Sequence, residues 1–548
     1  MHTLYDRYGI TSNQVSAGGR QDGSGCSDEN ARRAYHAEMS ARPNVLVLMF
    51  DQLTPAALGC YGNQIVHSPT IDRLAVEGVV FDAAYSNSPL CTPARYCMMT
   101  GQLPSATHGY DNAAYLASTI PTFAHYLRAG GYRTVLSGKM HFVGPDQLHG
   151  FESRRTPDIY PADFGWTPDW RTPLERIDWW YHNMDSVIGA GVAEVTNQLL
   201  FDDEVGFHAV RALHDLARSE DERPFLLVAS FTHPHDPYVT RQKYWDRYSD
   251  VDIPMPLVGR ADVDDDPHSQ RLRGAIDPHR APITDDNVRD ARRAYYGNVT
   301  YCDEWAGRLL ETVDSLGLSD DTVVMVVADH GDMLGERGLW YKMNFFEGSA
   351  RIPLIVHAPG RFSSGRVSEP VSLVDVLPTL LDIAGIERTA GSPTDALAGH
   401  SLLPLCAGGH RDEPVYGEYM AEGSVAPIVM IRRGALKFVA SPGDPDQLYD
   451  LAVDPQERQN LATHADYAAA LDEFHADAAQ RWDLTALQAD VLADQARRRF
   501  IDTALRQGRF TPWDYTPTRD ASGEYMRNHL DLNDVERLAR WPRTTKDG

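Results

Sequence analysis

The chain has 548 residues and a formal net charge of -26, which argues against nucleic acid or an anionic membrane surface as a partner. Apolar residues make up 43% of the sequence, but no apolar run approaches the roughly 20 residues that a membrane-spanning helix needs. The first residues lack the basic start and apolar stretch of a secretion signal. Together these features predict a soluble, cytoplasmic protein.

The segment 43–409 alternates apolar runs with helical patterns, such as 287–316 and 373–384, which predicts a doubly wound, mostly parallel α/β sheet. The apolar runs are continuous, as in strands whose two faces are both covered. The predicted strands are Asn44–Phe50, Thr134–Leu136, Phe225–Ser230, Thr322–Val327 and Pro353–Val356. Short strands with glycine and proline turns, and a helix near 463–482, predict a smaller antiparallel α+β subdomain over 410–507.

The two ends of the chain differ from these domains. Residues 1–42 are polar and rich in glycine and serine, which predicts a disordered extension, and Met39 is an alternative start to Met1. Residues 508–548 contain several large aromatic side chains but are too few to bury them in a core of their own. We expect this tail to make contacts between subunits of a homo-oligomer, either a dimer or a tetramer.

Carboxylate and imidazole side chains follow three of the predicted strands. They are Asp51 after the first strand, His233, His235 and Asp236 after Phe225–Ser230, and Asp329 and His330 after Thr322–Val327. Ligands of open α/β sheets bind just beyond the carboxyl ends of the strands. A single aspartate there is ordinarily a helix cap, but the coincidence of several such residues predicts one functional crevice.

The six cysteines are sparse and irregularly spaced, which is not typical of a disulfide framework, and no C-x-x-C pair indicates structural zinc. Cys91 stands out because Pro93 suits the first turn of a helix and would place Cys91 at its N-terminus. The helix dipole there would lower the pKa of the thiol. Arg95 follows one turn later, at a spacing too short for the loop of cysteine-dependent phosphatases.

Two motifs resemble those of the sulfatase superfamily. Cys91–Arg95 (CTPAR) fits C-x-P-x-R, the signature by which sulfatases mark a cysteine for oxidation to formylglycine, and Gly131–Lys139 resembles G-Y-x-T-x-x-x-G-K. The resemblance covers about residues 43–500 and implies an alkaline-phosphatase-like fold. Near-verbatim segments resemble choline sulfatase in particular, namely 139–150, 158–170, 230–238, 329–342 and 512–542.

The resemblance implies one divalent metal ion, held by Asp51, Asp329, His330 and the modified Cys91. Many sulfatases have an aspartate where this chain has Gln52, and an asparagine where it has His330. Both departures resemble the branch of choline sulfatases and phosphonate monoester hydrolases. Because a hard anionic ligand is replaced and a nitrogen added, calcium and manganese are both candidates, with magnesium as a third. A formylglycine-generating system is the implied partner.

The resemblance also implies roles around the nucleophile. The hydrated formylglycine would attack sulfur, with Asp329 as its base, and Arg95 and Lys139 would orient it. Lys139, Lys342, Asn112 and the metal would stabilise the charge that develops on the sulfate oxygens.

Proton transfers complete the implied reaction. His235 and Lys342 are the candidate acids for the leaving oxygen, and His233 competes for the place of His235. His141 would deprotonate the second hydroxyl, so that the sulfated intermediate collapses back to the aldehyde.

The implied substrate is choline-O-sulfate, whose quaternary ammonium group suits aromatic faces and carboxylates. Four of the ten tryptophans lie between Trp166 and Trp180, a pattern that a buried aromatic core would also explain. The resemblance favours Trp166 and His182 as cage residues. Glu422 and Asp483 are candidates for the negative charge.

Two alternatives stay open at this point. A phosphonate monoester or phosphodiester hydrolase would use the same residues. A relic of the family that only binds an osmolyte would show a broken nucleophile or metal set, whereas this chain has the complete set.

Overall fold

The computed structural model describes residues 42–173, 182–276, 282–358, 360–387, 397–508 and 531. The predicted N-terminal extension and the tail therefore lie almost entirely outside the described residues. Within these ranges, no helix combines the length and the apolar character needed to cross a bilayer.

An eight-stranded sheet forms the centre of the described chain, in the order β12-β2-β11-β9-β1-β7-β4-β5. Its strands are β1 (Asn44–Asp51), β2 (Val79–Phe81), β4 (Arg133–Gly138), β5 (Ser153–Arg154), β7 (Phe225–Pro234), β9 (Thr322–Ala328), β11 (Leu354–His357) and β12 (Gly365–Val367). β1 lies between β7 and β9 and is parallel to both. These three strands are buried almost throughout, which confirms the interpretation of their apolar runs.

β11 corrects one detail of that interpretation. The predicted strand is present, but it runs antiparallel to both β9 and β2. A strand covered on both faces has the same continuous apolar pattern in either direction, so the pattern could not reveal this.

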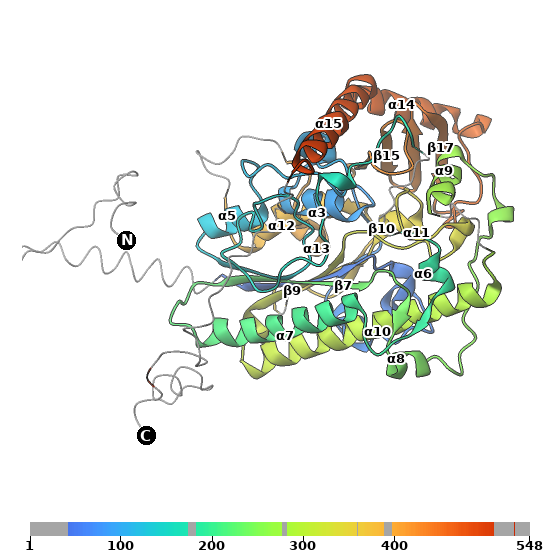
Figure 1. Ribbon diagram of the computed structural model, residues 1–548. Helices are drawn as coiled ribbons and strands as arrows, with labels where there is room; N and C mark the ends of the chain where they lie inside the picture. The colour runs from blue at the N-terminus through green and yellow to red at the C-terminus, as the bar shows by residue number, and fades with distance from the viewer. Residues whose placement is uncertain are drawn as a thin grey trace, which may run out of the picture. The chain divides into compact units, whose positions relative to one another are not determined.

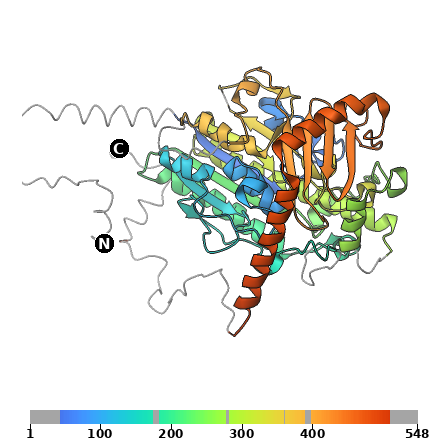
Figure 2. The ribbon, with the colours of Figure 1, turned by 90° about the horizontal axis from the view of Figure 1, so that it is seen from above.

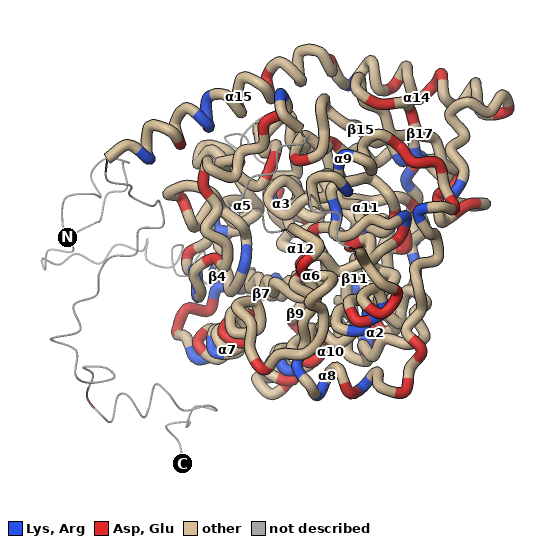
Figure 3. The backbone as a smooth tube through the Cα atoms, turned by 45° about the vertical axis from the view of Figure 1, so that its right-hand side comes forward, with Lys and Arg blue, Asp and Glu red and all other residues tan. Residues whose placement is uncertain are grey.

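Helices cover both faces of the sheet, as a doubly wound fold requires (Figure 1). The helices α7 (Asn197–Arg218) and α10 (Asp285–Ser315) lie on one face, and α3 (Cys91–Thr100), α5 (Phe123–Ala129) and α12 (Val376–Ile383) lie on the other. One core of buried apolar side chains runs through these layers. Acidic and basic residues are spread over the helices and loops around the sheet (Figure 3).

The predicted antiparallel sheet near the C-terminus is present. It consists of β14 (Val415–Tyr419), β15 (Ile428–Arg433), β16 (Leu436–Ser441) and β17 (Asp444–Asp450), paired in chain order. In β15, Ile428 and Met430 join the main core, whereas Val429 and Ile431 join a second core beneath α14 (Ala468–Arg481). This alternation is the two-residue period of a strand with a different layer on each face. The helix α15 (Leu484–Leu505) follows and is drawn in red in Figure 2.

A buried ionic cluster joins this sheet to the loop that follows Lys342, one of the predicted active-site residues. The Lys437 ammonium on β16 donates to the Phe345 carbonyl at 2.7 Å and to Glu347 Oε1 at 2.8 Å, and it also pairs with Glu457. The Lys437 side chain is fully buried. Removal of its charge would leave the buried Glu457 carboxylate and the partly buried Glu347 carboxylate without their shared cation.

We predict that Lys437→Met lowers the free energy of unfolding by about 3–5 kcal/mol, because it breaks a buried charge cluster. Urea denaturation of the full chain would measure this. Lys243→Met is the matched control, since Lys243 pairs with Glu304 on the surface and should contribute at most about 1 kcal/mol. Equal effects of the two substitutions would contradict the prediction.

Candidate active site

The carboxyl ends of four parallel strands meet at one edge of the central sheet. Asp51 is the last residue of β1, Lys139 follows β4, His235 follows β7 and Asp329 follows β9. Each of these side chains is at most 1% exposed. Because the four strands are neighbours in the sheet, the structure brings these residues together in one buried cluster, at the strand ends where the sequence predicts the crevice.

Cys91 is the first residue of α3, and Pro93 lies in the first turn of that helix. The Cys91 Sγ lies 3.3 Å from His330 Nε2 and 3.8 Å from Asp51 Oδ1. The expected lowering of the thiol pKa is wrong, because burial and the Asp51 carboxylate raise the pKa of Cys91 to about 11. The unmodified thiol would be protonated near neutral pH and therefore a weak nucleophile.

Arg95 connects the strand ends from one fully buried position. Its Nη2 donates to Asp51 Oδ2 at 2.8 Å and its Nε to Asp329 Oδ2 at 2.9 Å. Its Nη1 donates to the Lys139 carbonyl at 2.6 Å and to Ser230 Oγ at 3.0 Å. Burial alone would raise the pKa of Asp51, but the Lys139 and Arg95 charges outweigh it and hold that pKa well below its usual range.

Asp51, Cys91, Asp329 and His330 fit a metal site, since one ligand atom of each lies within 4.8 Å of the others. Arg95 occupies the Oδ2 of each carboxylate, and each Oδ1 lies 3.8 Å from His330 Nε2. His330 Nδ1 faces the next backbone carbonyl at 3.0 Å, so Nδ1 carries the proton and Nε2 keeps its lone pair. Burial lowers the pKa of His330 to about 4, which keeps the ring neutral. Carboxylate oxygens and a neutral imidazole suit a divalent ion.

Lys342 and His235 form the second part of the crevice. The Lys342 ammonium donates to Gln52 Oε1 and lies 2.8 Å from His235 Nε2. His235 Nδ1 faces the backbone carbonyl of Asp236 at 2.8 Å, which makes Nε2 the accepting nitrogen. Burial and the Lys342 charge hold the pKa of His235 well below its usual range. The Asp236 carboxylate also lies 3.3 Å from His182 Nδ1.

His233, the competing candidate, lies in a different environment. Its Nδ1 is 2.7 Å from Asp202 Oδ2 on α7, and its ring packs against Tyr301 on α10. His235, which contacts Lys342, is therefore the imidazole of this pair that belongs to the crevice.

Sequence reasoning named Gln52 without a role at Lys342, and it missed Asp332, which holds Gln52 in place. Gln52, which has a positive φ of 65°, donates from its Nε2 to Asp332 Oδ2 at 2.6 Å. That bond fixes the side-chain amide so that Oε1 faces Lys342. Asp332 Oδ2 also accepts from the Tyr238 hydroxyl at 2.8 Å, and its Oδ1 accepts from the backbone N–H of Tyr341 at 3.1 Å. No periodicity or motif marks Asp332, because its partners come from three separate segments.

His141 follows Lys139 in the turn after β4. The backbone N–H groups of Met140 and His141 donate to one oxygen of Asp158 at 3.0 and 2.8 Å, which fixes this turn. The His141 ring is buried, and neither ring nitrogen has a hydrogen-bond partner among the described residues. Burial and the Lys139 charge lower the pKa of His141 to about 3. A neutral imidazole with two open nitrogens is suited to accept a proton from a bound group.

Asn112 lies beside the nucleophile position. Its Oδ1 accepts from the backbone N–H of Thr92 at 3.0 Å, so it caps the first turn of α3. The structure thus places Asn112 at the first turn of α3, which begins at Cys91.

The two predicted cage residues lie at opposite ends of a row of aromatic rings. The ring centroids are 6.4 Å apart for Trp166 and Tyr160, 5.9 Å for Tyr160 and His235, and 5.3 Å for His235 and His182. Trp166 is half-buried and also packs edge-on against His141 at 5.9 Å. Of the other tryptophans of the predicted segment, Trp170 is buried in a small apolar cluster, and Trp179 and Trp180 lie outside the described residues.

Glu422 and Asp483, the candidates for negative charge, have different environments. Glu422 is half-buried between β14 and β15, and its Oε2 has no hydrogen-bond partner among the described residues. Burial and the nearby Asp111 carboxylate raise the pKa of Glu422 to about 7, with Lys342 close enough to oppose them. Asp483 is exposed and caps α15 by accepting from the Ala486 N–H at 2.9 Å, so the structure does not bring it to the crevice.

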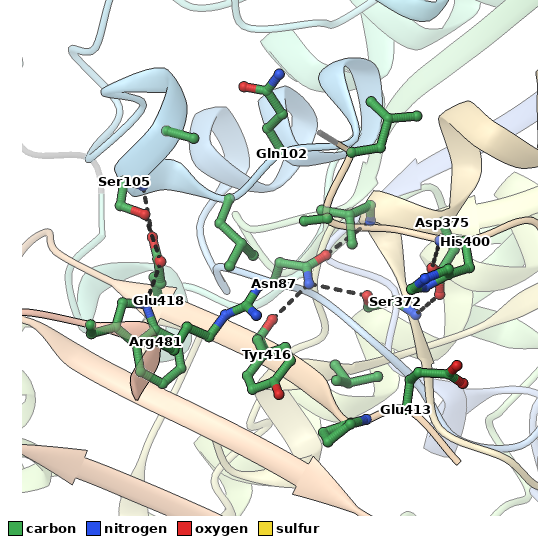
Figure 4. A pocket seen from close by; sticks show the side chains of 18 of the residues that line it. Asn87, Gln102, Ser105, Ser372, Asp375, His400, Glu413, Tyr416, Glu418 and Arg481 are labelled. Atoms are coloured by element: carbon green, nitrogen blue, oxygen red, sulfur yellow. Dashed lines mark hydrogen bonds between the residues drawn. The ribbon is translucent and has the colours of Figure 1, made fainter. Parts of the chain in front are cut away.

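A separate cavity of about 590 Å³ lies between the small sheet and the segment after α3 (Figure 4). The Glu418 carboxylate in its wall accepts hydrogen bonds from Ser105 and from Trp482. Arg481 stacks on Tyr416 there, 3.7 Å from the ring centroid. The predicted site residues are not among those that line this cavity, and it is distinct from the crevice around Cys91.

Three family profiles match parts of this chain. The profile described as Sulfatase matches residues 43–386, that of the N-sulphoglucosamine sulphohydrolase C-terminal region matches 335–482, and that of the choline sulfatase C terminal region matches 489–541.

Similar proteins agree with these matches. The choline-sulfatase of Rhizobium meliloti (strain 1021) is 51% identical over 512 residues, which cover 92% of this chain and 99% of the relative. An arylsulfatase of Clostridium perfringens (strain 13 / Type A) is 29% identical, with 79% and 92% covered. The crystal structure of the phosphonate monoester hydrolase of Agrobacterium radiobacter gives a TM-score of 0.65 at 25% identity, with 82% and 96% covered. The strand-end carboxylates, the C-x-P-x-R helix and these matches together establish that the chain belongs to the sulfatase family and is a sulfatase with an alkaline-phosphatase-like fold.

Proposed function

We propose that this sulfatase hydrolyses choline-O-sulfate to choline and sulfate. The observation that carries the proposal is the presence of two kinds of side chain around the nucleophile position. Buried lysine and arginine side chains lie around Cys91, and the row of aromatic rings from Trp166 to His182 would, with the Glu422 carboxylate, suit a quaternary ammonium group. The 51% identity to a choline-sulfatase, over almost the whole length of both proteins, supports the same substrate.

The proposed cofactors are a formylglycine at Cys91, made by a formylglycine-generating system, and one calcium, manganese or magnesium ion. The formylglycine supplies the nucleophilic hydroxyl of an aldehyde hydrate, and the metal supplies positive charge to the sulfate oxygens. Asp51, Asp329 and His330 would hold the ion through the atoms that Arg95 leaves open. Asp329 would also serve as the base for the nucleophile.

The remaining residues would bind the sulfate and move protons. Lys139 and Lys342 place ammonium groups beside Cys91, as their electrostatic effect on the thiol indicates. Because Lys342 donates to Gln52 and His235, its remaining N–H is available for the leaving oxygen. His141 would accept the proton released when the aldehyde is regenerated.

We also propose that the protein is cytoplasmic. The predicted boundary between the two domains at residue 409 and the predicted role of the tail in subunit contacts are kept as proposals. The cysteines within the described chain are free thiols, which agrees with a reducing compartment. On α15, Phe500 is 74% exposed, and a large apolar side chain in that position favours a contact with another subunit or with the tail.

A chain ending at Gly508 should form a smaller assembly than the full chain, because the aromatic tail is missing. Sedimentation of both chains at equal concentration would measure this. An assembly of unchanged size would make the tail a surface strap without a role in subunit contacts.

The nucleophile is tested on the Cys91 peptide. Mass spectrometry of active enzyme should show an aldehyde in place of the thiol, and full activity with an entirely unmodified thiol would contradict the proposal.

Arg95→Lys should lower kcat/KM by at least about a hundredfold, because a point charge cannot bridge two buried carboxylates. Arg128→Lys, at a partly exposed arginine, is the matched control and should keep the activity.

The substrate is tested by sulfate release from choline-O-sulfate, compared with a neutral alkyl sulfate of the same size and with a phosphonate monoester. Choline-O-sulfate should have the highest kcat/KM. Preference for the neutral ester would remove choline from the proposal, and preference for the phosphonate would favour the alternative function, which the Agrobacterium radiobacter fold neighbour represents.

Trp166→Ala should lower kcat/KM for choline-O-sulfate about 2–30-fold, which corresponds to roughly 0.5–2 kcal/mol for one cation–π contact. A neutral aryl sulfate should change much less. Trp245→Ala, which removes a tryptophan stacked with Arg293 on α10, is the control and should leave the ratio of the two substrates unchanged. An equal loss on both substrates would make Trp166 a packing residue.

A further inference from the structure

The helix α15 docks on the active-site region through one narrow stripe. Its buried residues are Val491, Gln495 and Arg498, spaced four and three residues apart and therefore on one face of the helix. Only one of the three is apolar. Polar contacts, which demand a defined geometry, consequently decide where this helix lies.

Arg498 makes most of these contacts. Its two terminal nitrogens donate to the two oxygens of Asp111, each at 2.7 Å, in a bidentate pair. Nη1 also donates to Thr167 Oγ1 at 3.2 Å, and Nε donates to Asp494 Oδ2 at 2.8 Å. Arg498 is 4% exposed and Asp111 is fully buried. Such a planar fork fixes both position and angle, which a lysine cannot reproduce.

The segments held in this way carry the residues at the proposed cation-binding end. Thr167 directly follows Trp166. Gln495 Oε1 accepts from the backbone N–H of Trp170 at 3.1 Å, and the Trp170 indole donates to the Ala421 carbonyl at 3.0 Å, directly before Glu422.

The two carboxylates at this end, Asp111 and Glu422, differ in whether a cation is paired with them. Asp111 is neutralised by Arg498, whereas Glu422 has one oxygen without a hydrogen-bond partner in the described chain. Glu422 is thus the carboxylate that is available to a cation. The charges of Asp111 and Arg498 both act on Glu422, and they shift its pKa in opposite directions. The residues around Cys91 are held instead by Arg95 and the strand ends.

We infer that Arg498 is a specificity-determining positioning residue, which places Trp166 for the cationic end of the substrate by holding Thr167, and which pairs with Asp111 so that Glu422 is the carboxylate left for the cation. The inference rests on the proposed choline-O-sulfate activity. Arg498 acts through these neighbours and leaves the sulfate-binding end to other residues, so its loss affects charged and neutral substrates differently.

The test uses the full-length enzyme with its formylglycine and metal. Arg498→Lys keeps the charge but loses the fork, and we expect KM for choline-O-sulfate to rise about tenfold while kcat stays within about threefold. For a neutral aryl sulfate, kcat/KM should stay within about threefold. Arg497→Lys is the matched control, because Arg497 is exposed on the same helix and pairs with Asp494 at 3.4 Å. It should change neither substrate.

An equal loss on both substrates, or no change on either, would overturn the inference. If Arg498→Lys fails to fold, Asp111→Asn keeps the shape of the acceptor, removes its charge and should show the same selective rise in KM. An unmutated enzyme without preference for choline-O-sulfate would refute the proposed function together with this inference. A preference that is present and survives both substitutions would refute the inference alone.

Discussion

The buried guanidinium of Arg95 is the interaction on which the site depends. Two carboxylates, Asp51 and Asp329, end adjacent strands with no exposure to water, and burial of unpaired charge is costly. Arg95 binds one oxygen of each and also reaches the turn after β4, so it aligns the strand ends, and together with Lys139 it balances the two negative charges. The second oxygen of each carboxylate is thereby directed at His330, where a divalent ion fits.

The same requirement for pairing explains the rest of the crevice. Lys342 is fixed by Gln52 and His235, and Gln52 is itself fixed by Asp332. In interiors of this kind, a buried polar atom without a partner calls for an explanation, and a bound ligand is one. The open nitrogens of His141 and the open oxygen of Glu422 are such atoms, and the bound substrate that we propose would explain them.

The C-terminal part of the chain contacts the catalytic domain at two places near the predicted site residues. Lys437 ties the small sheet to the loop after Lys342, and α15 ties the aromatic segment to the loop that caps α3. The match to the choline sulfatase C-terminal profile begins at residue 489, so it includes the docking stripe of α15. A segment that matches the choline sulfatase C-terminal profile thus packs against Asp111 and Thr167 of the domain that matches the sulfatase profile.

The sequence by itself determined the buried strands, the strand-end carboxylates and the helix that begins at Cys91, because periodicity, strand ends and C-x-P-x-R are local signals. It could not determine the direction of β11, since a doubly covered strand has the same pattern either way. It also predicted the wrong pKa shift for Cys91, because burial and Asp51 outweigh the helix dipole. The roles of Asp332 and Arg498 come from partners far away in the sequence, which only the tertiary structure brings within hydrogen-bonding distance. Asp483 is the opposite case, an acidic residue that the sequence suggested for the site. In the structure it caps the helix α15. Only the tertiary structure distinguishes a carboxylate that caps a helix from one that faces the site.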